Sequence, residues 1–162
     1  MSTEPSLDPD VAMYRSGNMY GYEIRDPYPG EDEYFKKNTH ATGMAAEDNK
    51  ITINPYSSIP ERSKALVAKN EALRLYMREH NIDPQFEVTD KQKQYFKENG
   101  SAYGIPGNEK HLRATIVSRI VTGDESAQDV TDEQRIVANS IMNQMRTRSK
   151  LSGQFKGVVD GR

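Results

Sequence analysis

The clearest hydrophobic pattern in the chain runs from Pro60 to Asn81. At 100° per residue its apolar side chains gather on one broad arc, while Glu71 and Arg74 fall on the opposite side. Proline suits the first turn of a helix, where its missing N–H needs no partner, and Glu61 favours the positive end of the helix dipole. The pattern predicts an amphipathic helix over residues 60–81 whose apolar arc is covered on more than one side. The arc consists of Ala65, Leu66, Ala68, Ala72, Leu73, Leu75, Tyr76 and Met77.

Three further helices are predicted downstream, over residues 89–99, 108–122 and 131–148. The first and the last open on nearly identical strings, VTDKQ and VTDEQ. In each, a threonine followed three residues later by glutamine fits a capping box, in which the two side chains satisfy free amides at the helix start. We interpret the two strings as independent helix starts rather than as an internal repeat, because the residues that follow them differ. Asn99-Gly100 and Gly123 are the predicted stops.

One short segment before the first helix has the pattern of a β-strand. In KITINPY, residues 50–56, Ile51 and Ile53 alternate with polar residues and therefore point the same way. Asn54-Pro55 ends the segment. We expect an edge strand that packs on the first helix.

Residues 1–50 have the composition of an extended or irregular arm. Prolines and glycines interrupt any long period, and aliphatic side chains are sparse, yet five of the nine tyrosines lie here. Tyrosine offers apolar area with a polar tip and is enriched at protein interfaces. We therefore predict that the arm binds neighbouring protein subunits; the alternative is a flexible tail whose tyrosines have no particular role. The candidate partner-binding residues are Tyr14, Tyr20, Tyr22, Tyr28, Tyr34 and Phe35.

Residues 149–162 are predicted to form a basic C-terminal tail. From residue 146 onward the chain has five bases and one acid. Such a patch can contact phosphates, although cations near the end of a helix are also favoured by the helix dipole alone. The candidate nucleic-acid contacts are Arg146, Arg148, Lys150 and Lys156.

Composition and charge narrow the class of protein. The chain is 35% hydrophobic and has no tryptophan, so we expect part of it to depend on a partner for burial. Residues 1–50 hold ten acids and five bases, and residues 51–162 hold fourteen acids and seventeen bases, which gives the net charge of −2 without a strongly basic face. The absence of cysteine excludes disulfides, and neither a signal peptide nor a membrane-spanning run is expected.

No pattern of catalytic or ligand-binding residues stands out. Phosphate-binding glycine loops, dinucleotide fingerprints, zinc-protease motifs and nucleophile elbows are all missing. The three histidines have no ligand partner at helical spacing, and the adjacent acids at 31–33, 47–48 and 124–125 have solvated flanks. We therefore expect no catalytic residue, no metal and no cofactor.

Two stretches show a family resemblance: NPYSSIPERSKALVAKNEALRLYMREHNIDPQFEVTDKQKQYF and ATIVSRIVTGDESAQDVTDEQ. Together they resemble uncharacterised small proteins encoded among the structural genes of tailed bacteriophages and prophages. The resemblance covers Asn54 to Gln134, about half of the chain. It implies a component of a virion or of its assembly and assigns no residue a role.

These observations predict a mainly α-helical protein. Residues 51–148 would form a small four-helix module, with the arm at residues 1–50 and the tail at residues 149–162. The expected function is that of a non-enzymatic virion component of the tail, the head-to-tail joint or the capsid surface. It would be assembled in the bacterial cytoplasm as a homo- or hetero-oligomer held by the arm. The alternative is a small regulator that binds nucleic acid or a host enzyme through the helical module and the basic tail.

Overall fold

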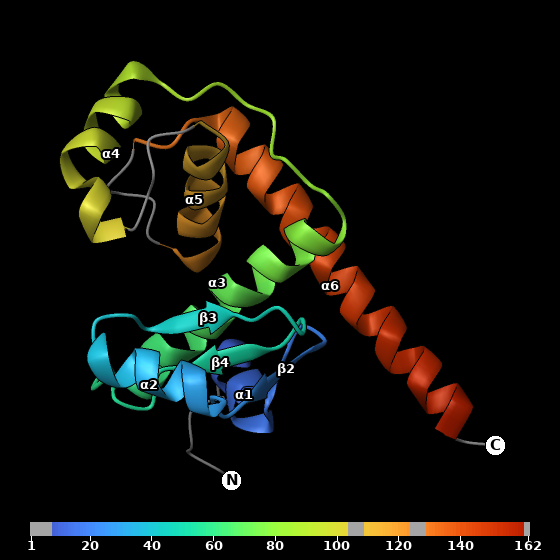
Figure 1. The fold of residues 1–162 in the computed structure, drawn as a ribbon. Coiled ribbons are helices and arrows are strands. Elements are labelled where there is room, and N and C mark those ends of the chain that lie inside the picture. The colour runs from blue at the N-terminus through green and yellow to red at the C-terminus, as the bar shows by residue number, and fades with distance from the viewer. Residues whose placement is uncertain (1–7, 104–108, 124–128, 161–162) are drawn as a thin grey trace, which may run out of the picture. The chain divides into compact units, whose positions relative to one another are not determined.

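The computed structural model describes residues 8–103, 109–123 and 129–160 (Figure 1). The chain is 61% helical, and its described residues form six helices and one small mixed sheet. The mainly helical class is confirmed, but the architecture is an α/β arrangement rather than a four-helix module. Two compact units are present: unit 1 comprises residues 1–75 with 148–162, and unit 2 comprises residues 76–147.

Unit 1 contains the sheet, whose strand order is β1-β2-β4-β3. β1 pairs antiparallel with β2, β2 pairs parallel with β4, and β3 pairs antiparallel with β4. The predicted strand at residues 50–56 is therefore real, but it lies inside the sheet and not at its edge. The elements are α1 (Pro9–Ser16), β1 (Asn18–Met19), β2 (Tyr22–Arg25), α2 (Pro29–Lys37), β3 (Gly43–Ala45), β4 (Ile51–Ile53) and the greater part of α3 (Glu61–Glu79).

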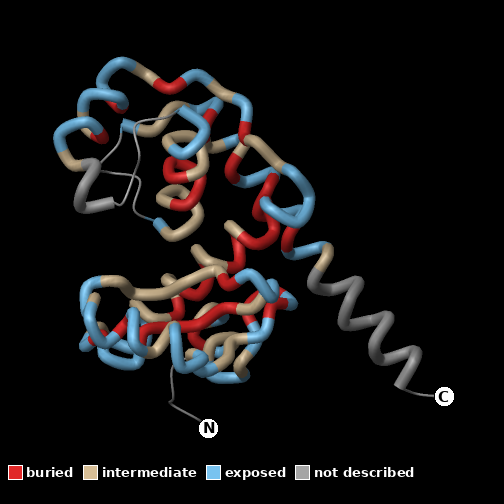
Figure 2. Tube along the Cα trace, viewed as in Figure 1, coloured by how far each residue is buried: buried red, intermediate tan, exposed pale blue. Residues whose placement is uncertain are grey.

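The prediction of an extended N-terminal arm is wrong for the described residues, because residues 8–45 form two helices and three strands. The folding of this region depends on a contact distant in sequence: Ile24 and Arg25 of β2 pair with Ile51 and Thr52 of β4. No hydrophobic periodicity within residues 1–50 indicates that β2 and β4 pair. Most of the side chains buried in this region are aromatic or methionine rather than aliphatic; the buried residues are Val11, Met19, Tyr20, Tyr22 and Phe35. Figure 2 colours the buried positions along the chain red.

The predicted central helix is confirmed as α3. Its alanines at 65, 68 and 72 are fully buried, as the apolar arc required. Asn81 stops the helix with a φ of 51°, and the amide of Ile82 donates to the carbonyl of Met77 at 2.8 Å. The close approach of β3 to α3 requires a glycine at position 43, because a Cβ on Gly43 would lie 2.7 Å from Cγ1 of Val67.

Unit 2 begins its helices as the sequence predicts. The Thr89 amide donates to Oε1 of Gln92 at 3.0 Å, and the Gln92 amide donates to Oγ1 of Thr89 at 3.1 Å. Thr131 and Gln134 make the same two bonds at 3.1 and 3.2 Å. Both capping boxes are therefore confirmed, at the starts of α4 (Asp90–Tyr103) and α6 (Asp132–Asp160).

The two capping boxes also contact each other, which the sequence did not indicate. Nε2 of Gln92 donates to Oε1 of Gln134 at 2.7 Å, and Nε2 of Gln134 donates to Oε1 of Gln92 at 2.8 Å. Nε2 of Gln134 also donates to the carbonyl of Glu87 at 2.9 Å. Both side chains are buried, so the reciprocal amide pair satisfies polar atoms that would otherwise be costly inside the unit.

An apolar cluster of buried residues holds unit 2 together. Its buried members are Val88, Phe96 and Ile116, and partly buried side chains pack against them: Phe86, Tyr95, Leu112 and Ile120. The predicted third helix is confirmed as α5 (Glu109–Thr122), followed by Gly123 with a φ of 86°.

Two predicted helix ends are wrong. α4 continues past Gly100 to Tyr103, and Nδ2 of Asn99 donates back to the Tyr95 carbonyl at 2.9 Å instead of terminating the helix. α6 runs on to Asp160, so residues 149–160 are helical rather than an irregular tail. Glycine in a helix costs only about 1 kcal/mol, and the sequence has no proline after residue 106 that would break α6.

Candidate interaction surface

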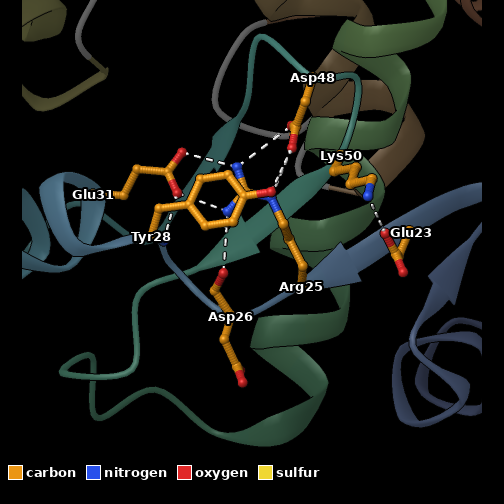
Figure 3. Close-up of polar contacts among 7 residues, drawn as sticks. All are labelled: Glu23, Arg25, Asp26, Tyr28, Glu31, Asp48 and Lys50. Carbon is orange, nitrogen blue, oxygen red and sulfur yellow. Dashed lines mark hydrogen bonds and ion pairs between the residues drawn. The ribbon is translucent and has the colours of Figure 1, made fainter.

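Arg25, at the end of β2, is the centre of a polar cluster that joins three segments of unit 1 (Figure 3). Its Nη1 and Nη2 donate to the two carboxylate oxygens of Glu31 on α2, at 2.7 and 3.0 Å. Its Nε and Nη2 donate to Asp48, between β3 and β4, at 3.0 and 3.4 Å. Nη1 also donates to the Asp26 carbonyl at 3.1 Å, so all five N–H groups of the guanidinium are used.

The charges of this cluster stabilise one another. Hydrogen bonds from the guanidinium lower the pKa of Glu31 and of Asp48 below their ordinary values, and those bonds raise the pKa of Arg25. The Arg25 side chain is 11% exposed and that of Glu31 20%, so water screens this ion pair less than a pair on the open surface. The cluster therefore fixes the start of α2 against β2 and against the segment that precedes β4.

Tyr28 covers the cluster on the solvent side. The guanidinium carbon of Arg25 lies 3.7 Å from the centre of the Tyr28 ring, and the Tyr28 hydroxyl donates to Asp48 at 3.3 Å. The Tyr28 amide donates to Glu31 at 2.8 Å and so starts α2. Tyr28 is nevertheless 54% exposed. The result is an exposed aromatic ring held in a defined orientation by a stacked cation.

Two other exposed tyrosines belong to the same part of unit 1. The hydroxyl of Tyr56 donates to the carboxylate of Asp32 on α2, at 2.9 and 3.0 Å, and this bond raises the pKa of Tyr56. Tyr34 on α2 rests edge-on against the buried ring of Phe35, with 5.9 Å between the ring centres. Tyr34 is 49% exposed and Tyr56 40%. We call the exposed rings of Tyr28, Tyr34 and Tyr56 the α2 aromatic surface.

The structure separates the predicted partner-binding residues into two groups. Tyr20, Tyr22 and Phe35 are core residues of unit 1 and are not available to a partner, so the prediction is wrong for these three. Tyr14 is partly buried, and its desolvation, with the nearby charge of Glu61, raises its pKa. Only Tyr28 and Tyr34, from the predicted set, present a large exposed ring.

The candidate nucleic-acid contacts do not form a described basic patch. Arg148 lies over the ring of Tyr22, with its guanidinium carbon 4.6 Å from the ring centre, and Nη1 of Arg146 donates to Asn143 on the same helix at 3.3 Å. Lys150 and Lys156 lie on α6, but their side chains fall outside the part of the chain that is described.

Two residues of the site, Arg25 in the polar cluster and Tyr56 in the α2 aromatic surface, were missed in the sequence. Arg25 is the only base between residues 16 and 35, among five acids, and that isolation was a usable signal for a shared counter-ion. Tyr56 lies beyond the predicted arm, and no local pattern connects it to Asp32. The acids at 31–33 and 47–48 were expected to be solvated, but Glu31 and Asp48 hold Arg25, and residues 124–125 fall outside the described part.

No group of residues in the described part of the chain has the composition and geometry of a metal site. None of the helices described there combines the length and the apolar character that crossing a bilayer requires. Searches among protein-family models, curated proteins and solved structures found no match to this chain.

Proposed function

We propose that this chain is a non-enzymatic assembly protein that binds neighbouring protein subunits through the α2 aromatic surface. The observation that carries the proposal is the presence of three exposed tyrosine rings, of which Tyr28 and Tyr56 are held by polar contacts and Tyr34 packs against the ring of Phe35. Exposed aromatic side chains that are already ordered lose little entropy on binding and are typical of interface hot spots. The folded segment that contains them replaces the extended arm as the proposed attachment site.

The chemistry of the surface supports binding rather than catalysis. Arg25, Glu31 and Asp48 are the titratable groups with the strongest mutual contacts there, and the Arg25 guanidinium uses all its donors on the two carboxylates and on the Asp26 carbonyl. The lowered pKa of Glu31 and of Asp48 keeps both carboxylates ionised at neutral pH, where a general acid would need a raised pKa. These groups therefore orient Tyr28 for contact.

The most concrete setting is a tailed-phage virion, in the tail, the head-to-tail joint or the capsid surface. This part of the proposal rests on the resemblance of residues 54–134 to proteins encoded among phage structural genes. A small protein with one ordered aromatic surface suits such a position, where subunits are joined by many modest contacts.

Co-sedimentation with particles tests the proposal. Epitope-tagged protein, produced in cells that form the native particles, should travel with them in a density gradient. The variant Tyr28→Ala/Tyr34→Ala/Tyr56→Ala should stay in the soluble fraction while its circular dichroism shows an intact fold. Ile136→Ala, which removes a side chain on α6 that is 69% exposed, is the matched control and should still co-sediment. Parent protein that never travels with particles would contradict the virion assignment.

A further inference from the structure

α1 is attached to α3 by ion pairs between residues far apart in sequence. Nη1 of Arg62 lies 2.6 Å from Asp8, and Nη2 of Arg15 lies 2.6 Å from Glu61. Nζ of Lys69 lies 3.1 Å from Asp10, and this last pair is the most shielded, with side-chain exposures of 10% and 17%. The residues joined are separated by 46 to 59 positions, so a second copy of the chain can supply the same partners.

The segment from residue 8 to residue 19, here called the N-terminal segment, contains α1 and β1 and ends at the turn that leads into β2. Val11 of α1 and Met19 of β1 are buried. The hydroxyl of Tyr20, the first residue of the turn, donates to Asp10 at 3.1 Å and so joins the turn to α1. If the segment moved as one body, the contacts within α1 and β1 would move with it, and its contacts with β2 and α3 would need to be remade.

The connection to β2 is a strained two-residue turn. Met19 pairs with Tyr22, which leaves Tyr20 and Gly21 as the turn, and both have a positive φ, of 51° and 93°. Glycine adopts such a backbone freely, but a tyrosine is disfavoured there, and asparagine is the usual residue at the first position. Opening this turn into an extended connection therefore removes backbone strain.

From these observations we infer that two copies of the chain exchange their N-terminal segments. In the exchanged dimer, α1 and β1 of each copy pack on α3 and β2 of the other, with residues 20–21 as the hinge. Every ion pair and every β1–β2 hydrogen bond is re-formed between copies, while the strain of the two turns is released. The inference goes beyond the proposed function, because it uses surfaces separate from the α2 aromatic surface and names a second copy as the occupant.

Engineered cysteines can distinguish exchange from ordinary association. The Ile24 amide donates to the Gly17 carbonyl at 2.8 Å, which makes the adjacent Asn18 and Glu23 a non-hydrogen-bonded cross-strand pair. Such pairs have a Cα separation of about 4.5 Å, within the range that a disulfide bridges. Both residues are exposed, and the natural chain has no cysteine to interfere.

The full-length double variant Asn18→Cys/Glu23→Cys should be refolded from denaturant at high protein concentration, separated by gel filtration and then oxidised. In an exchanged dimer the disulfides join two chains, so a covalent dimer is expected on a non-reducing denaturing gel. The monomer fraction should give only internally linked chains. When the single variants Asn18→Cys and Glu23→Cys are mixed and refolded together, a heterodimer linked between position 18 of one chain and position 23 of the other should form only if exchange occurs.

Two results would overturn the inference. One is the absence of any dimer after refolding at the highest soluble concentration. The other is a dimer that separates into internally linked monomers on the denaturing gel. The outcome is read from which chains the disulfide joins, so it is independent of whether Tyr28, Tyr34 and Tyr56 bind a partner.

Substitutions at the hinge test its strain. Tyr20→Asn relaxes the turn in the monomer, because asparagine tolerates the left-handed backbone better than tyrosine does. The cost of that backbone for tyrosine corresponds to about a tenfold change in an equilibrium constant, so the dimer-to-monomer ratio should fall about tenfold for each hinge. Tyr20→Phe keeps the strained backbone and removes only the hydroxyl bond to Asp10, so it is the matched control. An equal dimer fraction in both folded variants would show that turn strain does not drive exchange. Added salt should speed exchange by screening the exposed ion pairs.

Discussion

Unit 1 and unit 2 stabilise their internal contacts with different polar groups. In unit 1 the shielded contacts are charged, as in the Arg25 cluster and the Lys69–Asp10 pair. In unit 2 the buried contact is the neutral Gln92–Gln134 pair. Unit 2 has ion pairs as well: those of Lys91 and Lys93 are largely exposed and contribute little, while the Arg113–Asp83 pair is partly shielded, with side-chain exposures of 15% and 37%. The difference predicts that pH and salt act more strongly on unit 1 than on unit 2, whereas the loss of an apolar or amide contact acts mainly on the unit that contains it.

Truncation of a buried phenylalanine should have the largest effect. Phe96→Ala removes the central ring of the unit 2 cluster and should lower the free energy of unfolding by about 3–5 kcal/mol. The matched variant is Phe35→Ala, which makes the same change at a fully buried position in unit 1. Hydrogen exchange followed by mass spectrometry should show faster exchange in residues 88–120 for the first variant and in residues 22–53 for the second. Equal loosening of both regions by either variant would show that the two units open together.

Removal of one glutamine from the buried amide pair should have the next largest effect. Gln92→Ala leaves the Gln134 amide without its partner inside unit 2 and should cost about 2–3 kcal/mol. Gln94→Ala, two residues away, removes an exposed side chain and is the control, with an expected change close to zero. Chemical denaturation measures both. In the double variant Gln92→Leu/Gln134→Leu, the loss should be smaller than the sum of the two single alanine losses, because both side-chain amides are removed together and only the backbone groups of Glu87, Thr89 and Thr131 lose a partner.

Local patterns in the sequence were enough for the features that depend on neighbouring residues. The apolar arc of α3, the capping boxes at Thr89 and Thr131 and the stop at Gly123 all follow from side chains within one or two helical turns. They could be predicted because periodicity and capping are local physical effects. The same logic failed at Gly100, where a weak helix breaker was taken for a stop, and at residue 148, beyond which α6 continues to Asp160.

The fold of residues 8–45 could not be predicted in this way. β2 is a strand because it pairs with β4, and α2, which contains the buried Phe35, is bonded through Glu31 to Arg25 of β2. Both are contacts between distant segments, and a chain poor in aliphatic residues gives little sign of them. For the candidate surface, tyrosine content pointed to the residue type that forms its exposed rings. The choice between buried Tyr22 and exposed Tyr28 depended on tertiary structure alone.

Substitution of Arg25 should have a moderate effect that is specific to the geometry of its side chain. Arg25→Ala leaves Glu31 and Asp48 without their shared counter-ion and should cost about 1–2 kcal/mol. Arg25→Lys keeps the charge but has three donors in place of five, so it should recover only part of that loss. Arg62→Ala is the control for an exposed pair and should cost less than about 1 kcal/mol. Thermal denaturation ranks the three variants, and full recovery by lysine would mean that charge alone matters.

The smallest expected effect is on the pH dependence of stability, and it distinguishes a buried carboxylate of unit 1 from one in an ion pair. Burial raises the pKa of Glu71 on α3, although Arg74 and the backbone amide of Ala45 on the edge strand β3 act in the opposite direction. The folded protein therefore holds a proton on Glu71 at pH values where the unfolded chain has lost it. Its contribution to stability is greatest below the ordinary glutamate pKa and is lost as the pH rises through the raised value.

Glu31 has the opposite sign, because Arg25 lowers its pKa: its contribution is present above the ordinary glutamate pKa and is lost as the pH falls through the lowered value. Relative to the parent, Glu71→Gln should therefore become more stable as the pH is raised from acidic to neutral, while Glu31→Gln should become less stable. Urea denaturation across that pH range measures both differences. If the stability difference from the parent changed with pH in the same direction for both variants, the two carboxylates would not have pKa values shifted in opposite directions. The contrast between a buried carboxylate and a paired one would then not govern the acid response of unit 1.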